Sequence, residues 1–285
     1  MSDLLSGLHV HIVGLGLMGG SMALSLKGKV KRLTGYDTDA QVVEAAIAQG
    51  MIDSATGDSG ELVIVAVPAD RIPEVVAGLS LADGAVVIDL GSTKGAICDA
   101  LDKLPVNIAA VGGHPMCGLA ENGFSNAIPT LYRGARFVLC ETARTTPYAR
   151  QVAEALVVAC GAVPLWMDRL RHDYLTALTS HLPHLLSFAL MRLAAEIAAE
   201  EADVFQLAAG GFDGATRLAR TDAAMITGMF TTNQANLRRL AEALRQHLAL
   251  LDSLLETPEA LALELDQIVR ARRDYSTQYG ERPIA

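Results

Sequence analysis

Residues 10–19 read VHIVGLGLMG, an apolar run that leads directly into three glycines with the spacing GxGxxG. We expect a strand over Leu8–Val13 and a helix over Met18–Lys27, with the glycines in the turn between them. The first glycine allows a tight bend, the second lets a pyrophosphate approach the backbone, and the third lets helix and strand pack closely. The stretch therefore predicts a dinucleotide site on a Rossmann domain. Its predicted cofactor-binding residues are Gly14, Gly16, Leu17, Met18 and Gly19.

Asp37 supports this interpretation, because it follows the next predicted strand, Arg32–Tyr36, at the distance that such sites require. A carboxylate there accepts hydrogen bonds from ribose hydroxyls and repels a 2′-phosphate, which favours NAD over NADP. The alternative is that Asp37 only caps a helix that begins near Asp39. Two further residues predicted to contact the cofactor, Val67 and Pro68, lie where another strand ends.

The first half of the chain alternates short apolar runs with helical patterns, which is the rhythm of βαβ units in a mostly parallel sheet. After about Asp168 the strand signals stop and the pattern becomes helical, beginning with a long helix over Asp173–Glu200. We therefore predict an α/β Rossmann domain over residues 1–167, followed by an all-α C-terminal domain over 168–285. The predicted strands are Leu8–Val13, Arg32–Tyr36, Leu62–Val67, Ala85–Leu90, Asn107–Val111, Arg136–Leu139 and Ala162–Trp166.

A leucine stripe marks the helix predicted from Asn233 to Glu256, and a new helix is expected after Thr257-Pro258. Three- and four-residue steps place these leucines on one face. The stripe either packs within its own domain or meets the same helix of a second subunit, and an apolar stripe serves both purposes equally well. We expect a homodimer through the helical domain. The stripe consists of Leu237, Leu240, Leu244, Leu248, Leu251 and Leu255.

The overall composition is that of a globular protein, with 285 residues, 51% of them hydrophobic and 19% charged. A net charge of -9 argues against nucleic acid or an anionic membrane as a partner, because such partners select basic surfaces. The four cysteines show neither CxxC pairs nor zinc-ligand spacing, so we expect no metal and no disulfide framework. The N-terminus has no signal-peptide pattern. These features together predict a cytoplasmic protein.

Two segments carry residues suited to chemistry, at places where ligands bind to parallel sheets. DLGSTK spans residues 89–94 at the end of one strand, and GGHPMCG spans residues 112–118 in the loop expected after the next. His114, in the second segment, has an unperturbed pKa near neutrality and could transfer a proton. A lone histidine of this kind is more often a structural residue bonded to a backbone carbonyl. The two readings stay open on these residues alone.

Five motifs in order along the chain make the sequence resemble the prephenate and arogenate dehydrogenases of tyrosine biosynthesis. They are GLGLMGGS, DLGSTKG, GGHPMCG, SHLPH and GGFDGATRLA. The resemblance implies an NAD-dependent enzyme that oxidises and decarboxylates prephenate to 4-hydroxyphenylpyruvate. Arogenate dehydrogenase and a cyclohexadienyl dehydrogenase that accepts both substrates are the alternatives within the family.

The resemblance also implies roles for single residues. His114 corresponds to the catalytic residue that accepts the proton of the ring hydroxyl, and Ser92 to the serine that positions this hydroxyl. Ser180 and His184 fall on substrate-lining positions, and Arg217 on the arginine that binds a substrate carboxylate. Without the resemblance, a surface ion pair with a nearby aspartate would be the better interpretation of Arg217.

Two other residues and two rival functions stay open. His181 is either structural or a neighbour of the cofactor. Lys94 could touch substrate or dinucleotide, although a lysine at a helix start is more often solvated. The rival functions are another β-hydroxyacid-type dehydrogenase or imine reductase, and a protein that senses NAD without turnover.

Overall fold

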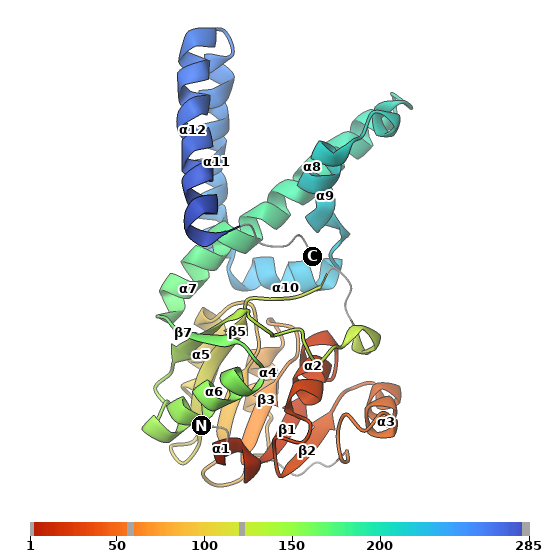
Figure 1. Ribbon diagram of the computed structural model, residues 1–285, viewed down its shortest axis with the longest axis vertical. Coiled ribbons are helices and arrows are strands. Elements are labelled where there is room, and N and C mark those ends of the chain that lie inside the picture. Colours follow the sequence, from red (N-terminus) through yellow and green to blue (C-terminus); the bar gives the residue numbers. More distant parts are fainter. Residues whose placement is uncertain (1–2, 56–59, 120–122, 281–285) are drawn as a thin grey trace. The chain divides into compact units, whose positions relative to one another are not determined.

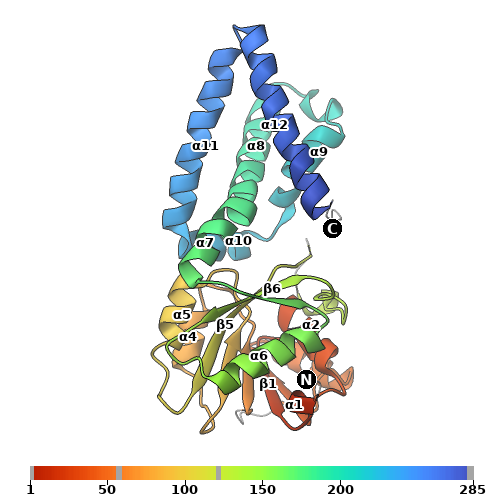
Figure 2. The same ribbon diagram turned by 60° about the vertical axis from the view of Figure 1, so that its left-hand side comes forward.

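The computed structural model describes residues 3–55, 60–119 and 123–280. Its centre is a seven-stranded sheet with the order β2-β1-β3-β4-β5-β6-β7, parallel throughout except where β5 meets β6 (Figures 1 and 2). All seven strands predicted from the sequence are present, which confirms the Rossmann-like fold. The strands are β1 (His9–Val13), β2 (Arg32–Tyr36), β3 (Leu62–Val65), β4 (Val86–Asp89), β5 (Ala109–Pro115), β6 (Arg136–Glu141) and β7 (Val163–Trp166).

Helices cover both faces of this sheet, which explains why its central strands are almost continuously apolar. Alternate strand residues such as Ile12 pack with α2 (Leu17–Leu26) and α6 (Pro147–Ala159) on one face. Their neighbours in sequence, such as Val65, pack with α4 (Ile72–Ala77) and α5 (Gly95–Leu101) on the other face. The remaining helices of this part are α1 (Asp3–Ser6) and α3 (Ala40–Ala48).

The strand β5 extends further than predicted. It runs to Pro115, so His114 lies within a strand and pairs with Val138 of β6, whereas we expected it in a loop after residue 111. In sequence, the two glycines before it look like the end of a strand. In the structure they allow neighbouring residues to pack closely against the strand. A Cβ on Gly112 would lie 2.7 Å from the Cys98 sulfur, and one on Gly113 would lie 2.4 Å from the Asp89 carbonyl oxygen.

Helical structure follows β7, and no strand occurs after it in the described part of the chain. The predicted helix over Asp173–Glu200 is wrong at its start, because α7 (Arg169–Thr176) begins earlier, where the Asp168 side chain accepts the backbone N–H groups of residues 170 and 171. It is also interrupted. A π-helical turn, Ala177–His181, joins α7 to α8 (Leu182–Ala198), and Pro183 follows it in the first turn of α8. Short helices α9 (Gly210–Thr216) and α10 (Ala223–Thr232) follow.

The chain forms two compact units, residues up to 234 and residues from 235 onward. The second unit consists of α11 (Gln234–Leu254 in full) and α12 (Pro258–Tyr279), which begins at Pro258 as predicted. The first unit therefore includes the sheet and also the helices up to α10. The division at 167/168 stays a prediction. None of the helices in the described residues is long and apolar enough to cross a membrane.

Candidate active site

The glycine turn after β1 has the shape that a pyrophosphate requires. Gly14 has a φ of +92°, and a Cβ there would lie 2.7 Å from the Ala66 carbonyl oxygen. A Cβ on Gly19 would lie 1.8 Å from the Gly14 oxygen, so this glycine allows α2 to pack against the turn. Gly16 is different, because nothing lies within 4 Å of its missing Cβ. It leaves the N-terminus of α2, with Leu17 and Met18 in its first turn, open to a phosphate group.

Asp37 lies beside this turn and is tied to it. Its carboxylate accepts the backbone N–H of Leu15 at 2.7 Å and that of Asp39 at 3.0 Å. The helix α3 is capped by Asp39 itself, whose side chain accepts the N–H of Gln41. The alternative that Asp37 serves as the cap of this helix is therefore wrong.

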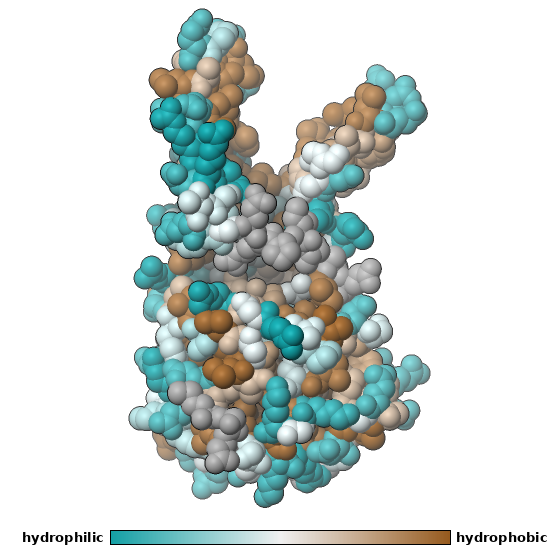
Figure 3. Space-filling model, viewed as in Figure 1, coloured by the Kyte–Doolittle hydropathy of each residue, from teal (hydrophilic) through white to brown (hydrophobic). Residues whose placement is uncertain are grey.

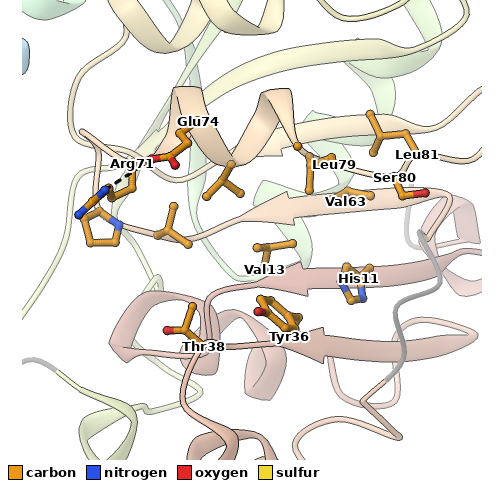
Figure 4. A pocket seen from close by; sticks show the side chains of 14 residues that line it. His11, Val13, Tyr36, Thr38, Val63, Arg71, Glu74, Leu79, Ser80 and Leu81 are labelled. Atoms are coloured by element: carbon orange, nitrogen blue, oxygen red, sulfur yellow. Dashed lines mark hydrogen bonds and ion pairs between the residues drawn. The ribbon is translucent and has the colours of Figure 1, made fainter.

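A pocket of about 750 Å³ opens beside Asp37, between β2 and α4. Figure 4 shows Tyr36 and Thr38 on one side of it and Arg71 on the other, with Arg71 bonded to Glu74. The predicted cofactor residues Val67 and Pro68 also line this pocket. Its size and mostly apolar lining suit the adenosine half of a dinucleotide. Together with the open glycine turn, the pocket means that the residues present fit NAD.

A buried ion pair lies where β4 and β5 end. Lys94 and Asp89 are both fully buried, and the Lys94 ammonium contacts the Asp89 carboxylate and donates to the Gly113 carbonyl at 2.5 Å. Asp89 also accepts the N–H groups of Gly91 and Gly113. The expectation of a solvated Lys94 is wrong, because the carboxylate at the end of β4 compensates its charge inside the protein. The pair fixes the backbone on which His114 is carried.

His114 is half-buried and belongs to a chain of hydrogen bonds between β5 and α7. Its Nδ1 lies 2.8 Å from Nε2 of His172, and Nδ1 of His172 lies 2.8 Å from the carboxylate of Asp173. Asp173 in turn accepts the N–H groups of Lys94 and Gly95 at the start of α5. These contacts hold α7 against the sheet, within the same compact unit.

Burial lowers the pKa of His114 well below the usual value for histidine, and the nearby His172 and Lys94 lower it further. The imidazole is therefore neutral at physiological pH, which is the form that can accept a proton. Ser92 lies half-buried between β4 and α5, one residue before Thr93, whose hydroxyl donates to Thr232 of α10 at 3.0 Å.

The predicted substrate residues of the helical part lie near one another. His184 donates from Nδ1 to the backbone carbonyl of Ser180 at 2.9 Å, which holds its ring beside the π turn. Burial lowers the pKa of His184, and the charge of Arg217 lowers it further. The charge of His184 in turn lowers the pKa of His181, and that of His181 lowers the pKa of His114.

His181 is the most enclosed residue of this series. It is fully buried, and its Nδ1 lies 3.3 Å from the side-chain amide of Asn233, which also donates to the Asp173 carbonyl. Burial lowers its pKa to about 4, so it is neutral at pH 7. This environment supports the structural interpretation of His181. His172, Asp173 and Asn233 have no predicted role in the site, and in the sequence only the adjacent letters HD at 172–173 indicate an imidazole oriented by a carboxylate.

Comparison with known proteins identifies two matching family models in order along the chain. The model described as "Prephenate dehydrogenase, nucleotide-binding domain" matches residues 22–165, and "Prephenate dehydrogenase, dimerization domain" matches residues 169–268. A prephenate dehydrogenase of Lactococcus lactis subsp. cremoris is 32% identical over 250 residues, which cover 84% of this chain and 69% of the relative.

Two solved structures are similar along nearly the whole chain. The prephenate dehydrogenase of Aquifex aeolicus, in complex with hydroxyphenyl propionate and NAD⁺, has a TM-score of 0.88 and 31% identity, covering 95% of this chain and 99% of its own. The arogenate dehydrogenase of Synechocystis has a TM-score of 0.77 and 26% identity, with 94% and 99% covered.

Proposed function

The chain belongs to the prephenate dehydrogenase family and is an NAD-dependent dehydrogenase, and on that premise we propose that prephenate is its preferred substrate and His114 its catalytic base. The observation that carries the proposal is the place of His114, which pairs with β6 just beyond the end of β4 and whose pKa burial lowers well below the usual value. A base that is uncharged at physiological pH can start the oxidation of an alcohol.

The proposed reaction begins at the hydroxyl group on the ring of prephenate. His114 accepts the proton of this hydroxyl as its carbon is oxidised to a ketone, and NAD, when bound, takes the hydride from that carbon. The ketone makes the quaternary ring carboxylate a vinylogous β-keto acid, so the carbon–carbon bond to this carboxylate breaks. Carbon dioxide leaves as the ring becomes aromatic. The protein therefore needs to bind, orient and deprotonate, but it needs no separate catalyst for decarboxylation.

Arg217, Ser180 and His184 are proposed to bind the substrate opposite the base, and Ser92 to position the reacting hydroxyl. Prephenate carries two carboxylates, while the protein as a whole is acidic, so binding requires a local cation. Arg217 suits this role because its planar guanidinium can bind a carboxylate through two hydrogen bonds. The charge of Arg217 lowers the pKa of His184, which supports placing both at one site.

Turnover with defined substrates tests this function. The purified full chain with NAD should form NADH and release an equal amount of carbon dioxide when prephenate is added, with arogenate giving a lower kcat/KM. A higher kcat/KM with arogenate would identify an arogenate dehydrogenase instead. NAD binding without turnover of either compound would favour the sensing protein, and turnover of a simple β-hydroxyacid alone would favour the other dehydrogenase.

We expect Arg217→Gln to raise the KM for prephenate by roughly 10- to 100-fold, the equivalent of one charge-assisted hydrogen-bonded contact. The kcat should change much less, because this contact exists before the transition state. Steady-state kinetics at saturating NAD measure both constants. Arg220→Gln is the matched control, since Arg220 lies exposed in the same short helix, Arg217–Arg220. An unchanged KM in the Arg217 variant would reject its role in binding.

The preference for NAD over NADP is proposed to depend on Asp37. Asp37→Ala should lower the ratio of kcat/KM for NAD to that for NADP by roughly 10-fold or more, because it removes both a ribose acceptor and the repulsion of a 2′-phosphate. Asp39→Ala is the control. It should cost about 1 kcal/mol of stability through loss of the α3 cap and leave the ratio unchanged. Equal ratios in wild type and the Asp37 variant would contradict the proposal.

Two properties of the whole protein are also proposed, a homodimer and a cytoplasmic location. Exposed apolar side chains on α11, on α12 and in the turn between them support the dimer, since Leu248, Leu263 and Leu255 are each more than half exposed. Figure 3 shows apolar surface along this helix pair. All four cysteines are free thiols, which suits a reducing compartment.

A further inference from the structure

We propose that His172 and Asp173 act together as a positioning pair that fixes the tautomer of His114. The pair keeps the His114 proton on Nδ1 and leaves Nε2 bare to accept the substrate proton. His172 touches His114 but not the reacting atoms, so it acts through the base. The inference rests on the proposed function, in which His114 is the base that accepts the proton of the substrate hydroxyl.

The charge and contacts of Asp173 decide which ring nitrogen of His172 carries a proton. Burial acts to raise the pKa of Asp173, but hydrogen bonds from His172 and from the N–H groups of Gly95 and Lys94 outweigh it and hold the pKa below its usual value. The group is therefore a carboxylate, which can only accept hydrogen bonds. One oxygen accepts from the backbone of Lys94 at 2.7 Å and the other from Gly95 at 2.8 Å. The 2.8 Å contact with His172 then requires a proton on Nδ1 of His172.

The same reasoning extends one ring further. A neutral imidazole that carries its proton on Nδ1 has a lone pair on Nε2. Nε2 of His172 lies 2.8 Å from Nδ1 of His114, so when His172 carries a single proton, the donor in this contact is Nδ1 of His114. The remaining nitrogen of His114, Nε2, then has no proton. The opposite tautomer would place an N–H group where the reaction needs a proton acceptor.

The pair also suits the charge that forms during the reaction. When His114 accepts a proton it becomes an imidazolium, and the Asp173 carboxylate lies one imidazole away as its counter-charge. Other groups around the pair are the Thr176 hydroxyl, 3.3 Å from Nε2 of His172, and the ammonium of Lys94, whose charge faces Asp89. His181, the remaining titratable neighbour of His114, is neutral at pH 7 because burial lowers its pKa to about 4.

Histidine ¹⁵N NMR of the full chain tests the inference directly, with His114 assigned by comparison with a His114→Asn sample. In the wild type at pH 8 we expect a protonated Nδ1 and a bare Nε2 for His114. In His172→Phe, which removes the acceptor but keeps an aromatic ring, the signal should shift to a mixture of tautomers or to the Nε2–H form. A wild-type His114 that carries its proton on Nε2 would overturn the inference.

Kinetics provide the second readout. His172→Phe should lower kcat by roughly 10- to 1,000-fold, which is part of the contribution of a general base. The KM values for prephenate and NAD should change little. His172→Gln should recover much of this loss, because its side-chain oxygen can accept a hydrogen bond from the Nδ1–H group of His114. His9→Phe is the matched control and should leave kcat unchanged. His9 is also half-buried and hydrogen-bonded, to Thr34, but it lies at the start of β1, away from the glycine turn.

The possible failures can be told apart. If Phe and Gln lower kcat equally while the His114 tautomer stays unchanged, the role of His172 is only structural and the inference is wrong. If the tautomers behave as expected but neither prephenate nor arogenate is turned over, the proposed function is wrong instead. The NMR experiment distinguishes these cases because it requires no substrate.

Discussion

Replacing His114 with asparagine is expected to lower kcat roughly 10²- to 10⁴-fold, the usual contribution of a general base. Asparagine keeps a polar side chain of similar reach within β5 but cannot accept a proton at neutral pH. The hydrogen bond from position 114 to His172 can still form, since the asparagine amide is a donor. The loss should therefore report on the missing base, and kcat measured with saturating prephenate and NAD is the relevant constant.

Cofactor binding separates this effect from damage to the fold. The Kd for NADH, measured by fluorescence titration, should be nearly the same in wild type and His114→Asn, because the glycine turn and Asp37 lie at the end of β1 and β2. His247→Asn, which replaces an exposed histidine of α11, serves as the control and should leave kcat unchanged. A kcat in His114→Asn within a few-fold of wild type would show that another group takes the proton.

Lys94→Met is expected to cost about 3–5 kcal/mol of stability, because it leaves the Asp89 carboxylate buried without its cation. Both side chains are fully buried, so water cannot replace the lost partner. For a chain of this size the cost corresponds to a fall in Tm of roughly 6–20 °C. Differential scanning calorimetry of the full chain at neutral pH measures this change.

Two comparisons make the interpretation of this variant specific. Lys29→Met removes a lysine that donates to the Ala159 carbonyl at the surface, and it should change Tm very little. The double variant Asp89→Asn/Lys94→Met removes both charges and should be more stable than Lys94→Met alone. If Lys94→Met resembles Lys29→Met, the buried pair contributes little and Asp89 is accommodated by its backbone donors alone.

The elements that could be predicted are those with a local pattern. The apolar run before Gly14 and the glycine spacing predict β1, α2 and the phosphate site, because each glycine acts within a few residues of its position. The seven strands follow from apolar runs between helical patterns. Pro258 after Thr257 predicts the start of α12 in the same way.

The features that could not be predicted depend on contacts between distant segments. In sequence, Gly112 and Gly113 look like the end of a strand. Only the structure shows that they belong to β5 and that Cys98 and Asp89 leave no room for a side chain there. Lys94 looks solvated until the sheet places Asp89 beside it. The start of α7 depends on the Asp168 cap, which the apolar pattern does not register. The role of His172 depends on contacts across more than 50 residues, which no local pattern contains.

The location of His114 inside a paired strand restricts how relatives can diverge. Within a sheet, a shift of one residue turns every side chain to the opposite face, so an insertion near the histidine would abolish the activity rather than adjust it. Helical segments such as 177–184 and 217–220 are under no such restriction. Selection or engineering for a new ring substituent should therefore accumulate its changes there, while the strand that carries the imidazole is inherited unaltered.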